Sequence, residues 1–308
     1  KNIESKIVTS KREARITTLF YAGSQPESNN IDQLEGMSNA GAVGLKLYTA
    51  PTTVNENDYA AEEFEEIVKE WHRVAPEKPI MLHSGKNNLK DFIELVCDKN
   101  SHHLHVCHVH NPEDVKMINS YKKNGLKITC GVCPHHFLKT SHDRFGQGWF
   151  ARMQPPLQDQ VIVKELVSML ASGEIDVIES DYAPHTPNLK LKAEVENPND
   201  DEGLNQCYGM SGIEHVVPIM LNLVRRELFT MDRLIDALHT KPLEILNLEK
   251  SIFDPEKNYS EWDISDSSIR RISEREVLSG SGWSPYVGYI SGGKLLKVVS
   301  DGQIVHGA

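Results

Sequence analysis

The sequence predicts an α/β fold in which short strands alternate with helices. Six runs rich in β-branched residues, and nearly continuous in apolar character, occupy residues 16–23, 44–50, 79–84, 104–109, 127–132 and 175–181. Such runs are typical of a parallel sheet that is covered on both faces. Because parallel neighbours need right-handed crossovers through helices, we expect either a (β/α) barrel or a doubly wound sheet.

The segments between these strands carry helical patterns. The third of these helices has clear ends, with Asn111-Pro112 before it and Asn124-Gly125 after it. Two more helices are predicted at about 212–227 and 231–247. In the first three helices, apolar side chains share one helical face: Phe64, Ile67, Val68 and Trp71, then Phe92, Leu95 and Val96, then Val115, Ile118 and Tyr121.

Two segments depart from this alternation. Residues 186–211 are polar, rich in Asn and acidic residues, and lack periodicity, so we expect a long loop of the functional or mobile kind. The C-terminal run KLLKVVSDGQIVHGA predicts two short strands around the turn at Ser300-Asp301-Gly302. This run therefore indicates a small β appendage.

Composition excludes several classes of function. The 308 residues carry a net charge of −11 and a pI near 5.7, which argues against a general nucleic-acid or membrane-surface binder. No apolar run approaches the roughly 20 residues of a membrane span, and the charged opening lacks the apolar core of a signal peptide. Five cysteines without regular spacing indicate reduced thiols, so a cytoplasmic location is expected. The chain begins with Lys1 rather than Met, so we expect the natural polypeptide to extend upstream.

Four predicted strands end with a side chain that can take part in a metal site. These residues are Lys46, His83, His108 and Asp181. In a (β/α) barrel the carboxyl ends of the strands face one mouth, where side chains from different strands converge. Two neutral imidazoles with oxygen ligands suit zinc. The sequence therefore predicts a zinc site at this mouth.

Six segments carry a resemblance to a known family: GLKLY (44–48), PIMLHS (79–84), HVCHV (105–109), VCPHH (132–136), SDYAPHT (180–186) and GMSGIE (209–214). They resemble dihydroorotases of the amidohydrolase superfamily, and most of all the dihydroorotase domain of multifunctional pyrimidine-synthesis proteins. The resemblance runs in order through nearly the whole chain. It implies a TIM-like (β/α) barrel of the amidohydrolase type with a small β-sandwich. It also implies a small-molecule substrate, and neighbouring domains of a polyprotein or a homo-oligomer as partners.

The resemblance implies a two-zinc centre bridged by a carbamylated lysine. On the matching motifs, Lys46 is the bridging lysine, and His83 and His108 hold one zinc ion. Asp181 binds the other and acts as the catalytic base and acid. A lysine ammonium cannot bind zinc, whereas a carbamate offers one oxygen to each metal. Two metals that share a hydroxide lower its pKa and polarise the substrate carbonyl.

Substrate contacts are implied further along the chain. His185 resembles the family's contact to the substrate carboxylate, and the segment from Gly209 to Gly212 resembles a substrate-side loop.

The chain also departs from the family pattern. The His-x-His motif of the family's first strand, and the arginine that follows it, have no counterpart here. Six strands are legible where a barrel has eight. We therefore expect an N-terminally incomplete barrel over residues 1–250, with residues 251–308 as a C-terminal extension and remnant of the β-sandwich. One zinc site is expected to be plausible and the second incomplete. Tyr182 stands where the family usually has His, and RMQPPLQ (152–158) lacks the usual polar or basic residues.

Other metal-capable residues have simpler interpretations. Cys130 and Cys133 form a C-x-x-C pair without thioredoxin context, so we expect a structural role. Strand alternation turns some histidines of the run 102–110 outward, which leaves His108 as the predicted ligand. His135 and His136 are expected to be hydrogen-bonded barrel histidines.

Three functions fit these observations. The first is a dihydroorotase-type cyclic amide hydrolase that interconverts carbamoyl aspartate and dihydroorotate, with very low activity expected for this chain alone. The second is a catalytically inactive, structural or oligomerisation domain of a carbamoyl-phosphate synthase/aspartate carbamoyltransferase polyprotein. The third is another cyclic ureide amidohydrolase, of the hydantoinase or allantoinase type.

Overall fold

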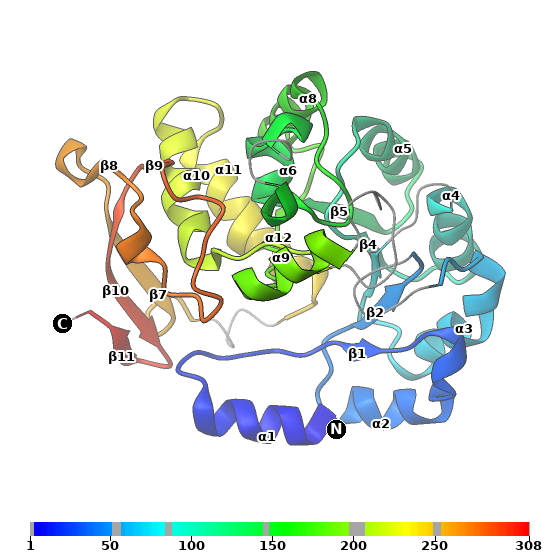
Figure 1. The fold of residues 1–308 in the computed structure, drawn as a ribbon. Coiled ribbons are helices and arrows are strands. Elements are labelled where there is room, and N and C mark those ends of the chain that lie inside the picture. Colours follow the sequence, from blue (N-terminus) through cyan, green and yellow to red (C-terminus); the bar gives the residue numbers. More distant parts are fainter. Residues whose placement is uncertain are drawn as a thin grey trace.

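A six-stranded parallel sheet forms the centre of the molecule (Figure 1). The computed structural model describes residues 3–50, 57–83, 88–143, 148–196, 207–248 and 254–307. The strands follow one another in chain order, and among the described residues the first and last do not pair with each other. They are β1 (Ala22–Gly23), β2 (Leu45–Tyr48), β3 (Ile80–His83), β4 (Leu104–Val106), β5 (Ile128–Val132) and β6 (Val177–Ile178). Each of the six predicted runs contains one of these strands, although β1 and β6 are only two residues long.

Amphipathic helices cover the outer face of this sheet (Figure 1). Trp71, Phe92 and Ile118 are fully buried, as their spacing predicted. The Asn111 side chain accepts a hydrogen bond from the Glu113 N–H and caps its helix, as expected for this residue type. The helices are α3 (Glu65–Val74), α4 (Leu89–Ile93) with its π-helical continuation η4 (Glu94–Lys99), α5 (Pro112–Lys123) and α8 (Gln160–Ser172).

Further helices complete the (β/α) unit. The helices predicted at 212–227 and 231–247 are present, in several short pieces: η6 (Ile213–His215) with α10 (Val216–Arg225), and α11 (Met231–Ile235), η7 (Asp236–Thr240) and α12 (Lys241–Ile245). The others are α1 (Ile3–Glu13), α2 (Leu34–Asn39), α6 (Pro134–Leu138) and α9 (Pro187–Glu196), with 3-10 turns η1 (Pro26–Ser28), η2 (Ile31–Gln33), η3 (Ala61–Phe64) and η5 (Gly148–Ala151). No helix of the described segments is both long and apolar enough to span a membrane.

The long loop predicted over 186–211 is wrong for its first part, which forms α9. The helix buries no apolar stripe that a sequence pattern could reveal, since Leu189 and Leu191 are 49% and 46% exposed. Pro187 at the first position and the straight-chain residues after it favour a helix all the same. Lys190 is fully buried and donates a hydrogen bond to the Arg152 carbonyl, which fixes the helix against the barrel. Residues 197–206 of the predicted loop lie outside the described residues.

Antiparallel strands at the C-terminus lie to one side of the parallel sheet (Figure 1). The predicted hairpin at Ser300-Asp301-Gly302 is confirmed as β10 (Lys294–Ser300) paired with β11 (Gln303–His306). β10 also pairs with β7 (Tyr259–Asp263), and β8 (Arg270–Arg271) pairs with β9 (Ile290–Ser291). Two 3-10 turns, η8 (Asp266–Ser268) and η9 (Glu274–Glu276), connect them. The expected boundary at residues 250 and 251 falls outside the described residues.

Candidate metal-binding site

The four residues predicted to form the metal centre come from neighbouring parts of the sheet. Lys46 lies within β2 and His83 is the last residue of β3. His108 follows the end of β4, and Asp181 follows β6. The strands run parallel, so His83, His108 and Asp181 lie toward their carboxyl ends, where barrel enzymes bind their ligands. Lys46 is the second residue of its four-residue strand, so the prediction that it ends the strand is wrong.

His83 and His108 lie side by side. The Nδ1 atom of His83 is 2.8 Å from the Nε2 atom of His108, and the rings are only 3% and 4% exposed as residues. Burial, followed by the positive charge of Lys46, lowers the pKa of His83 to about 3. Burial lowers the pKa of His108 as well, with His83 contributing. Both imidazoles are therefore neutral, which is the form that binds metals.

The two rings have facing nitrogens and outward nitrogens, and only the facing ones, His83 Nδ1 and His108 Nε2, are close enough to bind one ion together. Among the described residues, His83 Nε2 and His108 Nδ1 are buried without a hydrogen-bond partner. A buried polar atom left unpaired costs about 1–3 kcal/mol. The facing nitrogens either share one proton or, moved apart by a few tenths of an ångström, both point at one cation. This donor pair therefore suits a metal that prefers nitrogen.

Lys46 is held as a cation. Its Nζ donates to the Cys107 sulfur at 3.0 Å and lies 5.3 Å from the centre of the Tyr48 ring. Burial opposes the charged form, but Cys107, Tyr48 and the Glu179 carboxylate together raise the pKa of Lys46 above its ordinary value. The lysine is thus an ammonium in this arrangement, whereas a carbamate forms only from the neutral amine.

Asp181 is a carboxyl group with an unusual environment. Burial and the nearby charge of Glu179 raise its pKa to about 6, against the opposing effect of Lys46. Its φ is 42°, and that of His108 is 41°, so both residues adopt the left-handed conformation. This conformation is rare for residues other than Gly and costs on the order of 1 kcal/mol or more, and it is concentrated at functional sites.

Glu179 belongs to the same cluster, although the sequence did not predict it as a site residue. Its carboxylate accepts a hydrogen bond from the His108 N–H and lies 3.9 Å from His105 Nε2. Burial opposes ionisation, but His105, the His108 N–H and Lys46 lower the pKa of Glu179. The available signal was its position two residues before Asp181, because alternate residues of a strand share one face.

The implied substrate residues lie on two paired segments, one of which directly follows Asp181. Gly209 has a φ of 131° and Gly212 a φ of 89°, and a side chain at Gly209 would overlap Ala183. The Ala183 N–H donates to the Met210 carbonyl at 3.0 Å, which ties this segment to the one that bears His185. The His185 Nε2–H donates to the Tyr208 carbonyl at 2.8 Å.

Two further groups of metal-capable side chains converge among the described residues. One is His105, Cys107 and Glu179, and the other is Cys133, His135 and His136. In each group the possible ligand atoms lie within 4.8 Å of one another. Neither group contains Asp181, so no described set of three such side chains surrounds that carboxylate.

Relatives of the chain are found by sequence, although no family model matches it. It is 30% identical over 85% of its length to the multifunctional protein pyr1-3 of Dictyostelium discoideum, and this match covers 11% of the relative. It is 31% identical over 66% of its length to the dihydroorotase of Staphylococcus aureus, and this match covers 46% of the relative. The chain thus spans less than half the length of these relatives.

Solved structures share the fold. The L-hydantoinase of Arthrobacter aurescens superposes with a TM-score of 0.82 at 19% identity, covering 99% of this chain and 74% of that one. The inactive dihydroorotase-like domain of the Chaetomium thermophilum CAD-like multifunctional protein gives a TM-score of 0.70 at 20% identity, covering 98% and 79%. The fold is therefore that of the TIM-barrel amidohydrolases. The sequence relatives and this fold together make the chain a homologue of dihydroorotases and a member of the amidohydrolase superfamily.

Proposed function

We propose that this chain is a dihydroorotase-type amidohydrolase domain that binds one zinc ion through His83 and His108. The observation that carries the proposal is the facing pair of neutral, buried imidazoles, whose facing nitrogens are close enough to bind one ion. Zinc takes nitrogen ligands at about 2.0–2.1 Å, so two ligands on one ion are spaced a little wider than the 2.8 Å seen between the two rings.

Asp181 is the proposed proton carrier. A bound zinc ion would polarise a cyclic amide carbonyl and lower the pKa of a bound water. With its pKa raised to about 6, Asp181 can accept a proton and return it to a leaving nitrogen near neutral pH. His185 and the segment from Gly209 to Gly212 are the proposed contacts to the substrate, because the stretch after Asp181 pairs with that segment through the Ala183 N–H and the Met210 carbonyl.

Lys46 is proposed to become a carbamate only under specific conditions. Its ammonium is favoured by Cys107 and by Glu179. Carbamylation therefore requires that a bound cation displace the proton, and we expect it only in the presence of both zinc and carbon dioxide. Intact-mass measurement under native conditions, with and without zinc and bicarbonate, checks this.

The proposed setting is a multifunctional pyrimidine-synthesis protein, because the relative from Dictyostelium discoideum is a multifunctional protein and most of this chain aligns with it. In that setting the substrate is a small cyclic amide of the dihydroorotate kind, passed between neighbouring domains. Hydantoins are the second class to assay, since hydantoinases share the fold.

A second candidate function is a catalytically inactive domain with a structural role. The cluster around Lys46 favours it, because Glu179 supplies a negative charge close to the lysine without any metal. Tyr182, at the position where the family usually has His, hydrogen-bonds through its hydroxyl to Ser279 rather than presenting an imidazole.

One experiment separates the two. The chain is loaded with zinc and assayed with carbamoyl aspartate, dihydroorotate and hydantoin, beside Asp181→Asn and the double variant His83→Ala with His108→Ala. If the domain is an enzyme, we expect a slow, zinc-dependent turnover that is lost in both variants. Because no described group of three ligands surrounds Asp181, the rate should lie orders of magnitude below that of a two-zinc enzyme.

The remaining outcomes have definite meanings. Zinc bound through His83 and His108 without any turnover supports the inactive domain. Fast turnover that survives Asp181→Asn contradicts the proposed role of that carboxylate.

A further inference from the structure

The segment that follows β5 carries a second cluster of metal-capable side chains. Cys133, His135 and His136 lie at the start of α6, and they are 0%, 1% and 1% exposed. One possible ligand atom from each lies within 4.8 Å of the other two. A structural role was expected for all three, with the two histidines hydrogen-bonded inside the barrel.

The hydrogen bonds of this cluster do not fit that role. Neither ring nitrogen of His135 has a hydrogen-bond partner among the described residues. A neutral imidazole always has one N–H to donate, and leaving it buried and unpaired costs about 1–3 kcal/mol. Imidazoles buried this deeply normally have hydrogen-bond partners, so the two unpaired nitrogens of His135 indicate that a ligand binds there.

His136 is arranged as metal-bound histidines usually are. Its Nε2 hydrogen-bonds to the Pro155 carbonyl at 3.0 Å, and its buried Nδ1 has no described partner. An imidazole whose one nitrogen donates to a carbonyl has its lone pair on the other nitrogen, and this outer hydrogen bond fixes the orientation of a ligating ring. The hydrogen bond to Pro155 thus leaves the lone pair on His136 Nδ1, which is buried and available to a metal ion.

We propose that Cys133, His135 and His136 bind a zinc ion that is separate from the one assigned to His83 and His108. One thiolate and two imidazoles are a donor set that suits zinc, whose protein sites combine Cys and His ligands. Zinc–ligand distances of about 2.0–2.3 Å place neighbouring ligand atoms roughly 3.3–3.7 Å apart, so a small inward movement closes the site. A water completes the tetrahedron.

The other converging group, His105, Cys107 and Glu179, lacks the features that support this proposal. His105 Nδ1 is 3.0 Å from the Thr129 hydroxyl, and Cys107 accepts a hydrogen bond from the Lys46 ammonium. Glu179 accepts the His108 N–H. No buried side-chain nitrogen or oxygen of His105 or Glu179 is left without a described partner, in contrast to His135 and His136.

Cobalt(II) is the probe for the proposed site, because a thiolate bound to cobalt gives a charge-transfer absorption in the near ultraviolet. Metal-free protein is titrated with cobalt under reducing conditions, for the unmodified chain, Cys133→Ser, His135→Gln and Cys107→Ser. We expect the absorption in the unmodified chain and in Cys107→Ser, whose thiol is also buried but belongs to the other group. It should vanish in Cys133→Ser, and the cobalt affinity of His135→Gln should fall at least about tenfold.

Several outcomes overturn the proposal. These are absorption that persists in Cys133→Ser, loss of absorption in Cys107→Ser, or its absence from the folded, unmodified chain, which would leave only a water at His135. Circular dichroism shows whether each variant is folded. The variant His83→Ala with His108→Ala should keep the absorption even if it loses its own zinc and all turnover. Loss of the absorption in that variant contradicts a separate site, whereas loss of turnover alone bears only on the proposed function.

Discussion

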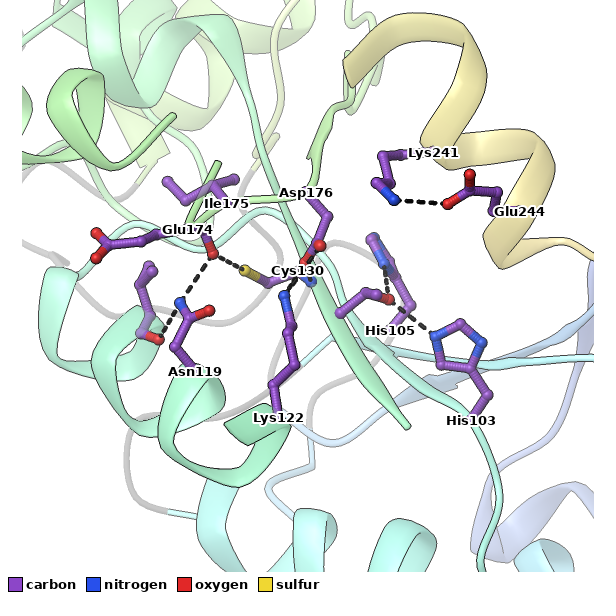
Figure 2. A network of polar contacts seen from close by, with 12 residues as sticks. His103, His105, Asn119, Lys122, Cys130, Glu174, Ile175, Asp176, Lys241 and Glu244 are labelled. Atoms are coloured by element: carbon purple, nitrogen blue, oxygen red, sulfur yellow. Dashed lines mark hydrogen bonds and ion pairs between the residues drawn. The ribbon is translucent and has the colours of Figure 1, made fainter. Parts of the chain in front are cut away.

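The two ends of the parallel sheet differ in how their buried polar groups are satisfied. At the amino end of β6, Asp176 accepts hydrogen bonds from Lys122 Nζ at 2.9 and 2.8 Å and from the Cys130 N–H at 2.9 Å (Figure 2). Arg233 donates to the carbonyls of Leu170, Ile175 and Asp176 nearby. At the carboxyl end, His83, His108 and His135 retain buried nitrogens without a described partner.

This difference separates stability from function. A polar group that finds its partners inside the protein contributes to folding and needs nothing further. A buried polar group without a partner lacks a hydrogen bond, and a bound ligand can supply the missing interaction. In (β/α) barrels the carboxyl end is the ligand-binding end, so the contrast agrees with the architecture.

The largest expected effect on stability is at the amino end. Asp176→Ala removes the partner of Lys122 and leaves the Cys130 N–H buried without an acceptor. We expect the free energy of unfolding in urea to fall by about 3–5 kcal/mol. Asp176→Asn keeps an acceptor for the N–H and should lose less. As a surface control, Glu165→Ala removes an exposed pair with Lys116 and should change the stability by less than about 1 kcal/mol. Equal losses of stability in all three variants would mean that the buried hydrogen bonds of Asp176 contribute no more than an exposed ion pair.

The second effect concerns zinc at the carboxyl end. The double variant His83→Ala with His108→Ala should weaken the binding of its zinc at least about 100-fold, because loss of outer-shell support alone costs 10- to 100-fold. A matched control exists in His72 and His102, whose Nδ1 atoms are 3.1 Å apart in another facing pair. His102 Nε2 is already hydrogen-bonded to the Lys78 carbonyl at 2.7 Å. Isothermal titration should show unchanged zinc binding when His72 and His102 are both replaced by Ala.

The third effect is a pH dependence in the metal-free protein. The pKa of Asp181 rises from 3.8 to about 6 on folding, so its ionised form is disfavoured in the folded state. Below pH 3.8 the carboxyl is protonated in both the folded and the unfolded state and has no effect on the free energy of unfolding. Between pH 3.8 and about 6 it ionises more readily in the unfolded state, so the free energy of unfolding falls, and it stays lowered above pH 6. Asp181→Asn should therefore stabilise the protein by about 2–3 kcal/mol at pH 7 and leave it nearly unchanged at pH 3.5. Urea unfolding at the two pH values decides this, and a gain at both would assign the effect to packing.

The smallest effect concerns the contact of Tyr182 with the C-terminal region. Its hydroxyl hydrogen-bonds to Ser279 at an exposed position. Tyr182→Phe should lower the stability by no more than about 1 kcal/mol, and a double-mutant cycle with Ser279→Ala should show a coupling of that size. A coupling near zero would mean that this bond does not join the two regions.

Much of the fold could be predicted from the sequence because its signals are local. The six strands are continuous apolar runs, and buried residues such as Trp71 and Phe92 recur at helical spacing. Helix α9 was missed because its two leucines face solvent and the residue that anchors it is a lysine. Lysine is rarely buried, so no pattern of apolar residues could reveal that contact.

The site was predictable only where strand ends mark it. His83 and His108 close successive strands, and the structure places them in contact. Their roles, and those of Lys46 and Asp181, remain proposals. The unpaired state of His135 could not be predicted, because it depends on which carbonyls and hydroxyls from distant segments reach the ring. The sequence shows that a histidine is present but not whether its ring nitrogens have hydrogen-bond partners.

The close approach of Gly131 to Glu179 has an evolutionary consequence. A side chain at Gly131 would occupy the space taken by the Glu179 carboxylate and would press on His105. Residues 131 and 179 therefore compete for one volume, and only one of them can extend a side chain into it. Among homologues the two positions should vary together, with a small residue at 179 wherever 131 is large. An alignment in which both positions carry long side chains would mean that these homologues arrange this part of the barrel differently.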